Sequence, residues 1–475
     1  MERNIHFAKT KIIGTIGPAS DSVEGLKMLI AAGLDVARLN MSHGSHELHD
    51  RTIQNIRKAA EQTGRPLPVL LDLCGPKIRV GELQEEFILQ EGDEIVITTE
   101  DIPGTKHRIS TTYAGLHDDV KRGNIILIDD GLIRLEVVDI TGRDILCKTI
   151  YGGTVKSKKG INLPNVDISI SSITEKDRKD LEFGIQHGVD FIALSFVRNR
   201  DDIKELRWIL KDRGASIPIV AKIEKPEAIQ DIDGIIEETD IVMVARGDLG
   251  VEMETEEVPI LQKMIIEKCN DFNKPVITAT QMLESMVVNP KPTRAEASDV
   301  ANAVFDGTDA VMLSAETSVG KYPREAVSIM NTIVKKAEER PDPRKHIHLR
   351  RRKDFHNHAD HICRAACIMA EDAGASAIIT ITKSGRTPQV LSRFRPHVPI
   401  LAFTESEEVI RKLKIIWGVQ GEILDSVGET DETLNKARRT ALSLGYVSRG
   451  DTVIYVTGIP LVESSQANMI KLEEL

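Results

Sequence analysis

Two charged residues stand two positions apart in the stretch IPIVAKIE, where Lys222 and Glu224 end an apolar run. If that run is a β-strand, both side chains point to the same face and place a cation beside a carboxylate. Asp248 ends the next apolar run, in the segment MVARGDLG. Two carboxylates from neighbouring strands could bind Mg²⁺ and leave positions open for water and substrate oxygens. Lys222 could then neutralise charge on a transferred group; the alternative is an ion pair that only lines the fold.

Similar groups follow other apolar runs of the chain. From the second run to the eighth, each ends in residues that can carry charge or form hydrogen bonds. Each residue alone is a weak indication, but random surface loops would not place such groups after every run. The further residues at these run ends are Arg38, Asn40, Ser42, His43, Asp72, Lys77, Arg79, Ser195, Arg198, Arg246, Thr278, Thr280, Ser314 and Glu316.

The elements that must hold these residues alternate between strand and helix. Three apolar runs lie between residues 11 and 72, and five more follow between 189 and 316, with helical segments between them. The first helical segment has apolar residues at helical spacing and ends at Gly33. Eight βα units predict a (β/α)₈ barrel, in which the active site lies at the C-terminal ends of the strands.

Two further domains interrupt or follow the predicted barrel. From residue 75 to 172, short β-type runs separated by turn residues predict an inserted all-β domain. Beyond a basic stretch near residue 344, four strand candidates alternate with helices again: ASAIITIT, VPILAFT, VQGEILD and DTVIYVT. We therefore expect a barrel from residues 1–74 and 173–343, a β-rich domain at 75–172 and a C-terminal α/β domain at 344–475.

The composition limits the class of protein. The 475 residues suggest about three domains. With 62 basic and 73 acidic residues the net charge is −11, and aromatic residues make up 4%, so no nucleic-acid partner is expected. Five scattered cysteines indicate a reducing compartment. The chain start has no signal-peptide pattern, and no apolar run approaches the ~18 residues of a membrane helix. We expect a cytoplasmic protein without a membrane partner.

Ten sequence blocks resemble the pyruvate kinase family, in family order and over almost the whole chain. They are TKIIGTIGPAS, VARLNMSHG, LLDLCGPKIR, KKGINLP, LSFVR, VAKIEKPEAI, MVARGDLGVE, ITATQMLESM, PTRAEASDVANAVFDGTDAVMLSAET and SGRTP. The resemblance implies a glycolytic enzyme, dependent on Mg²⁺ or Mn²⁺, that transfers the phosphoryl group of phosphoenolpyruvate to ADP and yields pyruvate and ATP. Such a transfer needs positioning and charge neutralisation more than covalent help, which fits the residue types above.

The resemblance also implies roles for the run-end residues. Arg38 and Lys222 would hold the phosphoryl group, and Lys222 would also stabilise the enolate. Glu224 and Asp248 would bind Mg²⁺. The expected substrate-binding residues are Arg38, Ser195, Lys222, Gly247, Asp248 and Thr280, and the expected catalytic residues are Lys222, Arg38, Thr280, Ser314 and Glu316, the last three around a water relay that protonates the enolate. For Gly247 and Asp248 alone, a plain helix N-cap by Asp248 is the alternative to anion binding.

The β-rich domain corresponds to the lid of the family, whose closure would keep water away from the phosphoryl group. By resemblance, Arg79 and Lys159 approach the phosphates of the nucleotide, with Pro18 and His43 nearby. A solvated basic turn is the alternative interpretation of Lys158 and Lys159.

One departure from the family concerns K⁺. Many members hold K⁺ through the equivalents of Asn40, Ser42, Asp72 and the carbonyl of Leu73, next to a GPEIR motif. This chain has GPKIR, in which Lys77 replaces the Glu with an ammonium group. That ammonium could supply the positive charge that K⁺ brings, so we expect an enzyme that does not require K⁺. The alternative is an exposed loop charge beside a bound K⁺.

A further phosphate site is expected in the C-terminal domain. The segment TKSGRTP lies between a strand and a helix, and family members bind phosphorylated effectors at the corresponding loop. Its residues are Thr382, Lys383, Ser384, Gly385, Arg386 and Thr387. An ordinary turn capped by Ser384 or Thr387 is the alternative. The later segment GIPLVESSQANMIKL departs from the Gly- and aromatic-rich loop of relatives regulated by fructose 1,6-bisphosphate, so we expect regulation by a sugar monophosphate or AMP. The resemblance implies assembly as a homotetramer.

Two other functions fit part of the pattern. A Mg²⁺-dependent lyase that makes a pyruvate enolate by C–C cleavage would need similar residues at the strand ends. It would not need a lid that carries Lys158, Lys159 and Arg79. A catalytically silent scaffold would not need the full set of expected catalytic residues, all of which are present.

Overall fold

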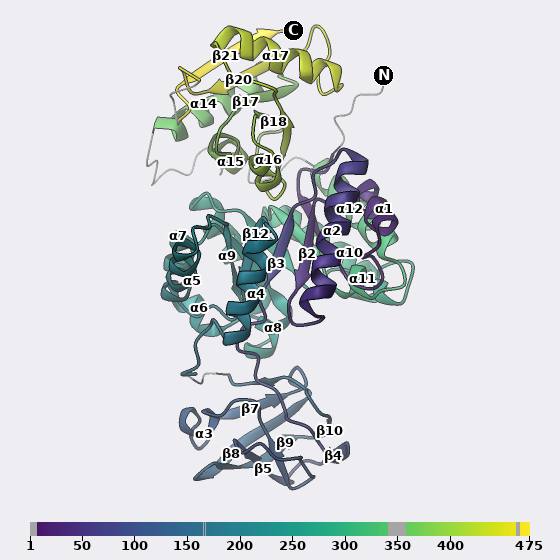
Figure 1. Ribbon diagram of the computed structural model, residues 1–475, viewed down its shortest axis with the longest axis vertical. Helices are drawn as coiled ribbons and strands as arrows, with labels where there is room; N and C mark the ends of the chain where they lie inside the picture. The colour runs from purple at the N-terminus through teal and green to yellow at the C-terminus, as the bar shows by residue number, and fades with distance from the viewer. Residues whose placement is uncertain (1–6, 165, 167, 341–357, 462–465) are drawn as a thin grey trace.

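A closed barrel of parallel strands forms the middle of the molecule in the computed structural model, which describes residues 7–164, 166, 168–340, 358–461 and 466–475 (Figure 1). Its strands follow one another in the order β1-β16-β15-β14-β13-β12-β3-β2. Their bounds are Lys11–Thr15 (β1), Val36–Asn40 (β2), Val69–Asp72 (β3), Phe191–Leu194 (β12), Ile219–Ile223 (β13), Ile241–Ala245 (β14), Val276–Ala279 (β15) and Ala310–Leu313 (β16). The predicted (β/α)₈ barrel is confirmed.

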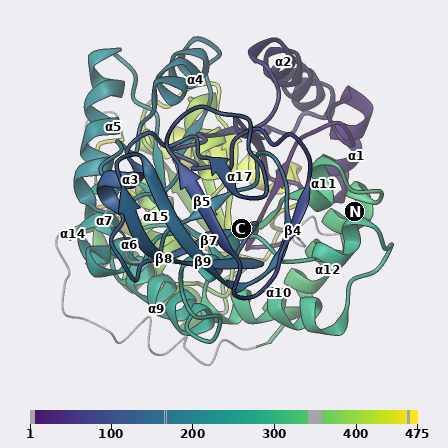
Figure 2. The same cartoon turned by 90° about the horizontal axis from the view of Figure 1, so that it is seen from below.

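Helices surround this barrel, as Figure 2 shows. The first begins after Ser22, whose side chain accepts a hydrogen bond from the N–H of Gly25. It ends at Gly33, as predicted, because Gly33 has the left-handed φ of 118°. The barrel helices are Val23–Ala32 (α1), His46–Thr63 (α2), Glu175–Gln186 (α4), Arg200–Asp212 (α5), Pro226–Gln230 (α6), Ile232–Glu238 (α7), Arg246–Glu252 (α8), Val258–Asp271 (α9), Glu284–Val287 (η1), Arg294–Asp306 (α10), Ala315–Ser318 (α11) and Pro323–Glu338 (α12).

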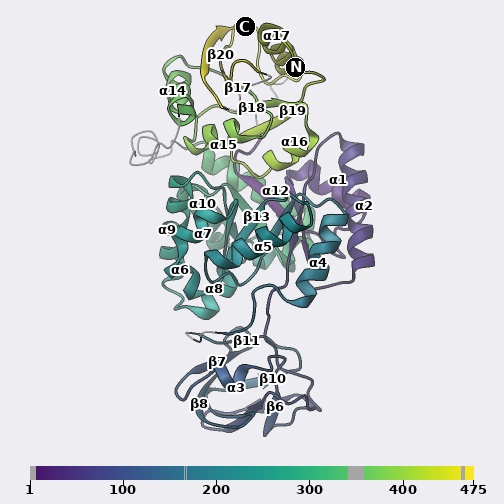
Figure 3. The same ribbon diagram turned by 60° about the vertical axis from the view of Figure 1, so that its left-hand side comes forward.

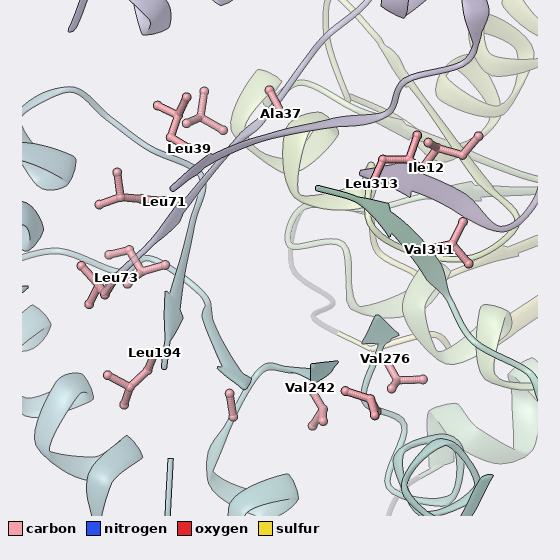
Figure 4. Close-up of a cluster of buried hydrophobic side chains, with 14 of the residues drawn as sticks. Ile12, Ala37, Leu39, Leu71, Leu73, Leu194, Val242, Val276, Val311 and Leu313 are labelled. Carbon is pink, nitrogen blue, oxygen red and sulfur yellow. The ribbon is translucent and has the colours of Figure 1, made fainter. Parts of the chain in front are cut away.

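Side chains alternate between the two sides of the barrel wall, as the two-residue period of a strand requires. Figure 4 shows part of the apolar cluster between the wall and the helices, with Ile12, Ala37, Leu39, Leu71, Leu73, Leu194, Val242, Val276, Val311 and Leu313 labelled. Arg38 lies between two members of this cluster, so its side chain points into the barrel. The same alternation turns Asp72 and Lys222 inward.

The β-rich domain lies beyond one end of the barrel and is inserted between β3 and α4 (Figure 3). Its sheets have the strand orders β11-β7-β8-β9-β5-β6 and β10-β4. The chain enters this domain directly after β3, so it lies on the side of the C-terminal strand ends. Its elements are Phe87–Leu89 (β4), Glu94–Thr98 (β5), Arg108–Ser110 (β6), Leu116–Asp119 (α3), Ile125–Ile128 (β7), Ile133–Thr141 (β8), Asp144–Tyr151 (β9), Gly153–Val155 (β10) and Ile161–Asn162 (β11).

The C-terminal domain contains a sheet of strand order β19-β18-β17-β20-β21 at the other end of the barrel (Figure 1). Four of these strands were predicted. The fifth was not, because its sequence MIKLEE has no apolar run and it lies, half exposed, at the sheet edge. The elements are His358–Asp372 (α14), Ala377–Ile381 (β17), Arg386–Arg393 (α15), Ile400–Thr404 (β18), Glu407–Leu413 (α16), Val419–Ile423 (β19), Thr430–Ser443 (α17), Thr452–Thr457 (β20) and Met469–Glu474 (β21).

The predicted domain boundaries stay predictions. The expected boundary between residues 343 and 344, with its basic stretch, lies outside the described residues. Across the described ranges, no helix is both long and apolar enough to cross a membrane.

Buried polar contacts join the C-terminal domain to the N-terminal end of the barrel. Arg395 donates to Asp309 Oδ1 at 2.9 Å, to Asn270 Oδ1 at 2.9 Å and to the carbonyl of Gly307 at 2.7 Å. The side chains of Arg395 and Asp309 are each 6% exposed. Lys11 at the start of β1 donates to the carbonyl of Val419 at 2.9 Å. Buried hydrogen bonds and one buried ion pair therefore join these two domains, which also share an apolar cluster.

Replacement of Arg395 is expected to destabilise the protein strongly. Arg395→Met leaves the buried carboxylate of Asp309 without its cation, which costs about 3–5 kcal/mol of unfolding free energy. Urea unfolding of both proteins measures the difference. The matched control is Arg393→Met, which removes a half-buried Arg that donates to the carbonyl of Asp271 and should cost much less. Equal losses in the two variants would contradict the prediction.

Candidate active site

Four charged side chains form a buried row at the C-terminal end of the barrel. Arg38 Nε donates to Asp72 Oδ2 at 2.7 Å. Lys222 Nζ lies 3.2 Å from Asp72 Oδ1 and 2.9 Å from Glu224 Oε1. Cations and carboxylates thus alternate from β2 through β3 to the end of β13. The side chains of Asp72 and Glu224 are both 1% exposed, so the charges of the row lie in an environment of low polarity.

Ser195 at the end of β12 closes the gap between β3 and β13. Lys222 Nζ donates to Ser195 Oγ at 2.6 Å, and Ser195 Oγ donates to the carbonyl of Leu73 at 2.7 Å. At the far end of the row, Arg38 Nη1 donates to Thr15 Oγ1 at 2.8 Å. The sequence had not singled out Thr15, although it is the last residue of β1 and so shares the strand-end position of the others.

The charges of the row shift the pKa values of its members. Burial disfavours the charged form of Asp72, but Lys222 and Arg38 outweigh burial and lower its pKa. Burial likewise disfavours charge on Lys222, yet Asp72 and Glu224 raise its pKa. Glu224 differs: burial, with repulsion from Asp248, raises its pKa although Lys222 acts against this. The two carboxylates therefore keep Lys222 charged, while Glu224 has a second negative charge, that of Asp248, close to it.

Glu224 and Asp248 offer a place for a metal ion. The N–H of Phe196 donates to Glu224 Oε2 at 2.7 Å, and the side chain of Asp248 is 31% exposed. Their mutual repulsion is what a divalent cation would relieve. No group of three or more His, Cys, Asp or Glu able to hold a metal occurs among the described residues. Two carboxylates completed by water and substrate oxygens suit Mg²⁺, so this donor set fits that ion.

Thr280 and Gly247 contact each other at the ends of neighbouring strands. The N–H of Gly247 donates to Thr280 Oγ1 at 2.7 Å. Thr280 has the left-handed φ of 69°, a conformation in which a Thr is strained. Helix α8 begins after Ala245, so Asp248 is not its N-cap, and no side chain caps this helix. The alternative interpretation of Asp248 as a plain cap is wrong.

Ser314 and Glu316 are tied to the backbone. Glu316 Oε2 accepts the N–H of Ser314 at 2.7 Å, and Oε1 accepts the N–H of Leu283 at 3.1 Å. Glu316 is 1% exposed, and burial raises its pKa. Both of its oxygens are thus engaged in shaping the loops beside Thr280. Arg246, which the sequence had not given a role, also supports these loops: it pairs with Asp299 at 2.8 Å and donates to the carbonyl of Thr280 at 2.7 Å.

Three of the four residues predicted to hold K⁺, namely Asn40, Asp72 and Leu73, already accept hydrogen bonds. Asn40 Oδ1 accepts the N–H of Ser42 at 3.1 Å. Asp72 belongs to the buried row, and the carbonyl of Leu73 accepts from Ser195. Lys77 Nζ lies 3.8 Å from Asp248 Oδ1, so its ammonium is next to a proposed Mg²⁺ ligand.

Cations gather where the nucleotide is expected. Burial lowers the pKa of His43, and the charges of Arg79, Lys77 and Arg38 lower it further. Arg79 Nη1 donates to the carbonyl of Lys158 at 2.9 Å. Lys159 Nζ pairs with Asp129 within the β-rich domain at 2.8 Å, and Lys158 pairs with Glu82 at 2.7 Å. Pro18 lies exposed in the loop after β1.

No serine or threonine side chain caps helix α15, which follows the loop predicted to bind an effector. Gly385, with a φ of 82°, is the N-cap of α15, and no side chain caps this helix. Thr382 Oγ1 accepts the N–H of Gly385 at 3.0 Å. The alternative interpretation, a turn capped by Ser384 or Thr387, is therefore wrong.

Comparisons with known proteins agree over nearly the whole chain. A model of the pyruvate kinase barrel domain matches residues 7–327, and a model of the pyruvate kinase alpha/beta domain matches residues 360–473. The chain is 49% identical over 468 residues to a pyruvate kinase of Geobacillus stearothermophilus, covering 98% of this chain and 80% of that protein. It is 47% identical over 468 residues to a pyruvate kinase of Bacillus licheniformis, with the same coverage.

A solved structure has the same fold. The crystal structure of a pyruvate kinase from Cryptosporidium parvum superposes with a TM-score of 0.93 at 39% sequence identity, covering 98% of this chain and 96% of that chain. Matches of this extent, both in sequence and in fold, place the chain in one family. The chain belongs to the pyruvate kinase family of phosphotransferases.

Proposed function

We propose that this chain transfers the phosphoryl group of phosphoenolpyruvate to ADP and forms pyruvate and ATP. The observation that carries the proposal is the buried row of Arg38, Asp72, Lys222 and Glu224 at the mouth of the barrel. Phosphoryl transfer depends mainly on positioning and on neutralisation of charge, and this row supplies fixed cations for both. The similarity to proteins named pyruvate kinase supports the same reaction.

Both cations of the row would act in the phosphoryl transfer, and Lys222 would also act on the enolate. Arg38 and Lys222 hold the phosphoryl oxygens while an oxygen of the terminal phosphate of ADP bonds to phosphorus. The bond from phosphorus to the enol oxygen breaks, and its electron pair stays on that oxygen. Lys222 stabilises the developing enolate, because Asp72 and Glu224 outweigh its burial and keep it protonated.

Glu224 and Asp248 would hold Mg²⁺, and Mn²⁺ could take the same place. When bound, the ion supplies positive charge beside the oxygens of the transferred group. The raised pKa of Glu224, caused by its burial and by Asp248, supports this assignment because a cation would reverse it.

The substrate carboxylate would bind at the N–H groups of Gly247 and Asp248 and at the hydroxyl of Thr280. The N–H of Gly247 donates to Thr280 Oγ1, so the two groups lie side by side, and the substrate carboxylate would have to take the place of this contact. A water held near Thr280 and Ser314 would protonate the enolate carbon. Glu316 would act in this relay by orienting Ser314, whose N–H it accepts.

The β-rich domain would act as the lid that brings the nucleotide to the row. Arg79 and Lys159 would contact its phosphates, with Pro18 and His43 close by. Burial and the cations Arg79, Lys77 and Arg38 lower the pKa of His43, and the presence of these cations around His43 supports a phosphate site. Lys159 would exchange its pairing with Asp129 for a phosphate oxygen.

The chain would work without K⁺, with Lys77 as the substitute cation. The engaged states of Asn40, Asp72 and the Leu73 carbonyl support this, since a K⁺ ion would compete for oxygens that already accept hydrogen bonds. The position of the Lys77 ammonium, 3.8 Å from Asp248, puts its charge at the site itself.

Regulation by a sugar monophosphate or AMP would use the loop from Thr382 to Thr387. Backbone N–H groups at the start of α15, which no side chain caps, support anion binding there. The loop also borders a cleft of about 750 Å³ between the barrel and the C-terminal domain, into which Lys211, Arg207 and Arg386 bring positive charge.

We further propose a homotetramer, on the family resemblance, and a cytoplasmic location, which the five free cysteines support.

Replacement of Lys222 tests the proposed reaction. Lys222→Met is expected to lower kcat on the order of 10³-fold or more, because the enolate loses its fixed cation. Pyruvate formation from phosphoenolpyruvate and ADP measures the rate, and circular dichroism checks the fold. The control Lys204→Met removes an exposed lysine that pairs with Asp201 on α5 and should leave kcat unchanged. A near-normal kcat in Lys222→Met would remove Lys222 from this role.

Omission of K⁺ tests the role of Lys77. In buffer that contains Mg²⁺ but neither K⁺ nor NH₄⁺, the wild type is expected to keep its full rate of pyruvate formation. Lys77→Glu should then require K⁺, because it exchanges the built-in cation for a carboxylate. A strict K⁺ requirement of the wild type would contradict the proposal and make Asn40, Ser42 and Asp72 ion ligands. If the wild type is inactive both in this buffer and after K⁺ is added, the lyase and scaffold alternatives must be considered again.

Replacement of Arg386 tests the effector site. AMP or a sugar monophosphate is expected to lower the phosphoenolpyruvate concentration at half-maximal rate by about fivefold or more. In Arg386→Ala the shift should fall below about twofold, since the cleft loses one of its cations. Arg393→Ala, at the other end of α15, is the matched control and should keep the full response. An unchanged response in Arg386→Ala would show that the effector binds elsewhere.

A further inference from the structure

A second buried ion pair lies directly beside the proposed metal site. Lys225 Nζ is 2.7 Å from Glu252 Oε1, and the two side chains are 8% and 1% exposed. Lys225 follows Glu224 in the chain. Glu252 is the last residue of α8, one helical turn after Asp248, and residues four apart share a helix face. The pair therefore connects the two segments that carry the proposed metal ligands.

The backbone alone does not fix the distance between those ligands. The ladder between β13 and β14 runs from the pair Val220 and Ile241 to the pair Ile223 and Val244. Glu224 and Asp248 both lie beyond its last pair. The contact between Lys225 and Glu252 joins the two segments directly through their side chains, at the level where the ladder has ended.

The lid is attached to the same carboxylate. Asn162 Nδ2 donates to Glu252 Oε1 at 2.9 Å. Asn162 belongs to β11, which pairs with β7 inside the lid. One oxygen of Glu252 thus accepts a donor from the barrel and a donor from the lid. A movement of the lid that displaces β11 acts on Glu252, and through Glu252 on α8.

The surroundings of Glu252 leave it dependent on these two donors. Its other oxygen, Oε2, is buried and has no hydrogen-bond partner among the residues that the structure describes. A small cavity of about 30 Å³ adjoins it, lined in part by Lys77, Phe196 and Asn162. A buried ion pair adds little net stability compared with apolar side chains of the same size. The position of the pair of Lys225 and Glu252 is therefore better explained by the two chain segments that it joins.

We propose that Lys225 and Glu252 are positioning residues that set the separation of Glu224 and Asp248, and that Asn162 makes this separation sensitive to the lid. This inference rests on the proposed function, because it takes Glu224 and Asp248 as the metal ligands. Neither Lys225 nor Glu252 touches the reacting atoms. Their effect should appear first in the affinity of the enzyme for the metal, before any substrate is present.

Direct binding of Mn²⁺ to the full-length enzyme, followed by electron paramagnetic resonance without substrates, tests the proposal. Glu252→Gln keeps the side-chain size but removes the charge that holds Lys225, and it is expected to raise the Kd for Mn²⁺ about tenfold. Lys225→Met should do the same, whereas Lys225→Arg, which keeps the charge, should stay within about threefold of the wild type. Wild-type affinity in Glu252→Gln would overturn the proposal.

A double variant separates weaker Mn²⁺ binding from a failure of the single variants to fold. Lys225→Met combined with Glu252→Met replaces the pair by apolar side chains of similar size, which buried sites tolerate. It should fold and still show the weakened Mn²⁺ binding. The structural control is Asp190→Asn, another buried carboxylate, which pairs with Arg57 and Arg411 before β12 at the N-terminal end of the barrel. It should lower the melting temperature without changing the Kd, and an equal change of Kd there would overturn a positioning role.

Two further variants separate the parts of the proposal. Asn162→Ala cuts the link to the lid and should raise the Kd for Mn²⁺ by about threefold; an unchanged Kd would overturn the coupling to the lid. Glu224→Gln should nearly abolish Mn²⁺ binding. If it binds Mn²⁺ as the wild type does, the proposed metal site is wrong and the inference falls with it. If it loses Mn²⁺ while Glu252→Gln does not, only the inference is wrong.

Discussion

The alternation of buried charges inside the barrel is the constraint on which the rest of the site depends. A carboxylate taken out of water needs a cation close to it. Asp72 has Arg38 at 2.7 Å and Lys222 at 3.2 Å, and Lys222 also reaches Glu224 at 2.9 Å. These residues come from β2, β3 and the end of β13, and the parallel ladders of β2 with β3, β3 with β12 and β12 with β13 bring those strand ends together.

The requirement that a buried carboxylate have a cation close to it is met differently at the two ends of the barrel. At the N-terminal end the carboxylate of Asp309 is matched by Arg395 of the C-terminal domain, so the charges there are satisfied within the protein. At the C-terminal end the balance is incomplete. Asp248 is about a third exposed, its nearest cation Lys77 is 3.8 Å away, and its charge raises the pKa of the buried Glu224. One end therefore joins two domains through paired charges, and the other leaves charge that is only partly paired.

The two-residue period of the strands and the order of apolar runs along the chain were enough to predict the barrel and to place Lys222 and Glu224 on one face. Contacts between separate loops were not predicted. The two-residue spacing of Lys222 and Glu224 was sufficient to place them side by side, because strand alternation is a local property. The barrel itself arises from eight repeats of one local pattern. The hydrogen bonds of Glu316 to two backbone N–H groups, and the contact of Lys77 with Asp248, could not be predicted, because they depend on how separate loops meet. The strand β21 was not predicted, because a strand at an exposed sheet edge needs no apolar run.

Helix α8 contacts both the segment that enters the β-rich domain and the segment that returns from it. The entering connection carries Lys77 to Asp248 in the first turn of the helix, and the returning connection carries Asn162 to Glu252 in its last turn. The helix spans only Arg246–Glu252, so both contacts act on a single short rigid body. The N–H of Gly247 also holds Thr280. A movement of the β-rich domain must therefore either shift α8 or break the contacts at both of its ends.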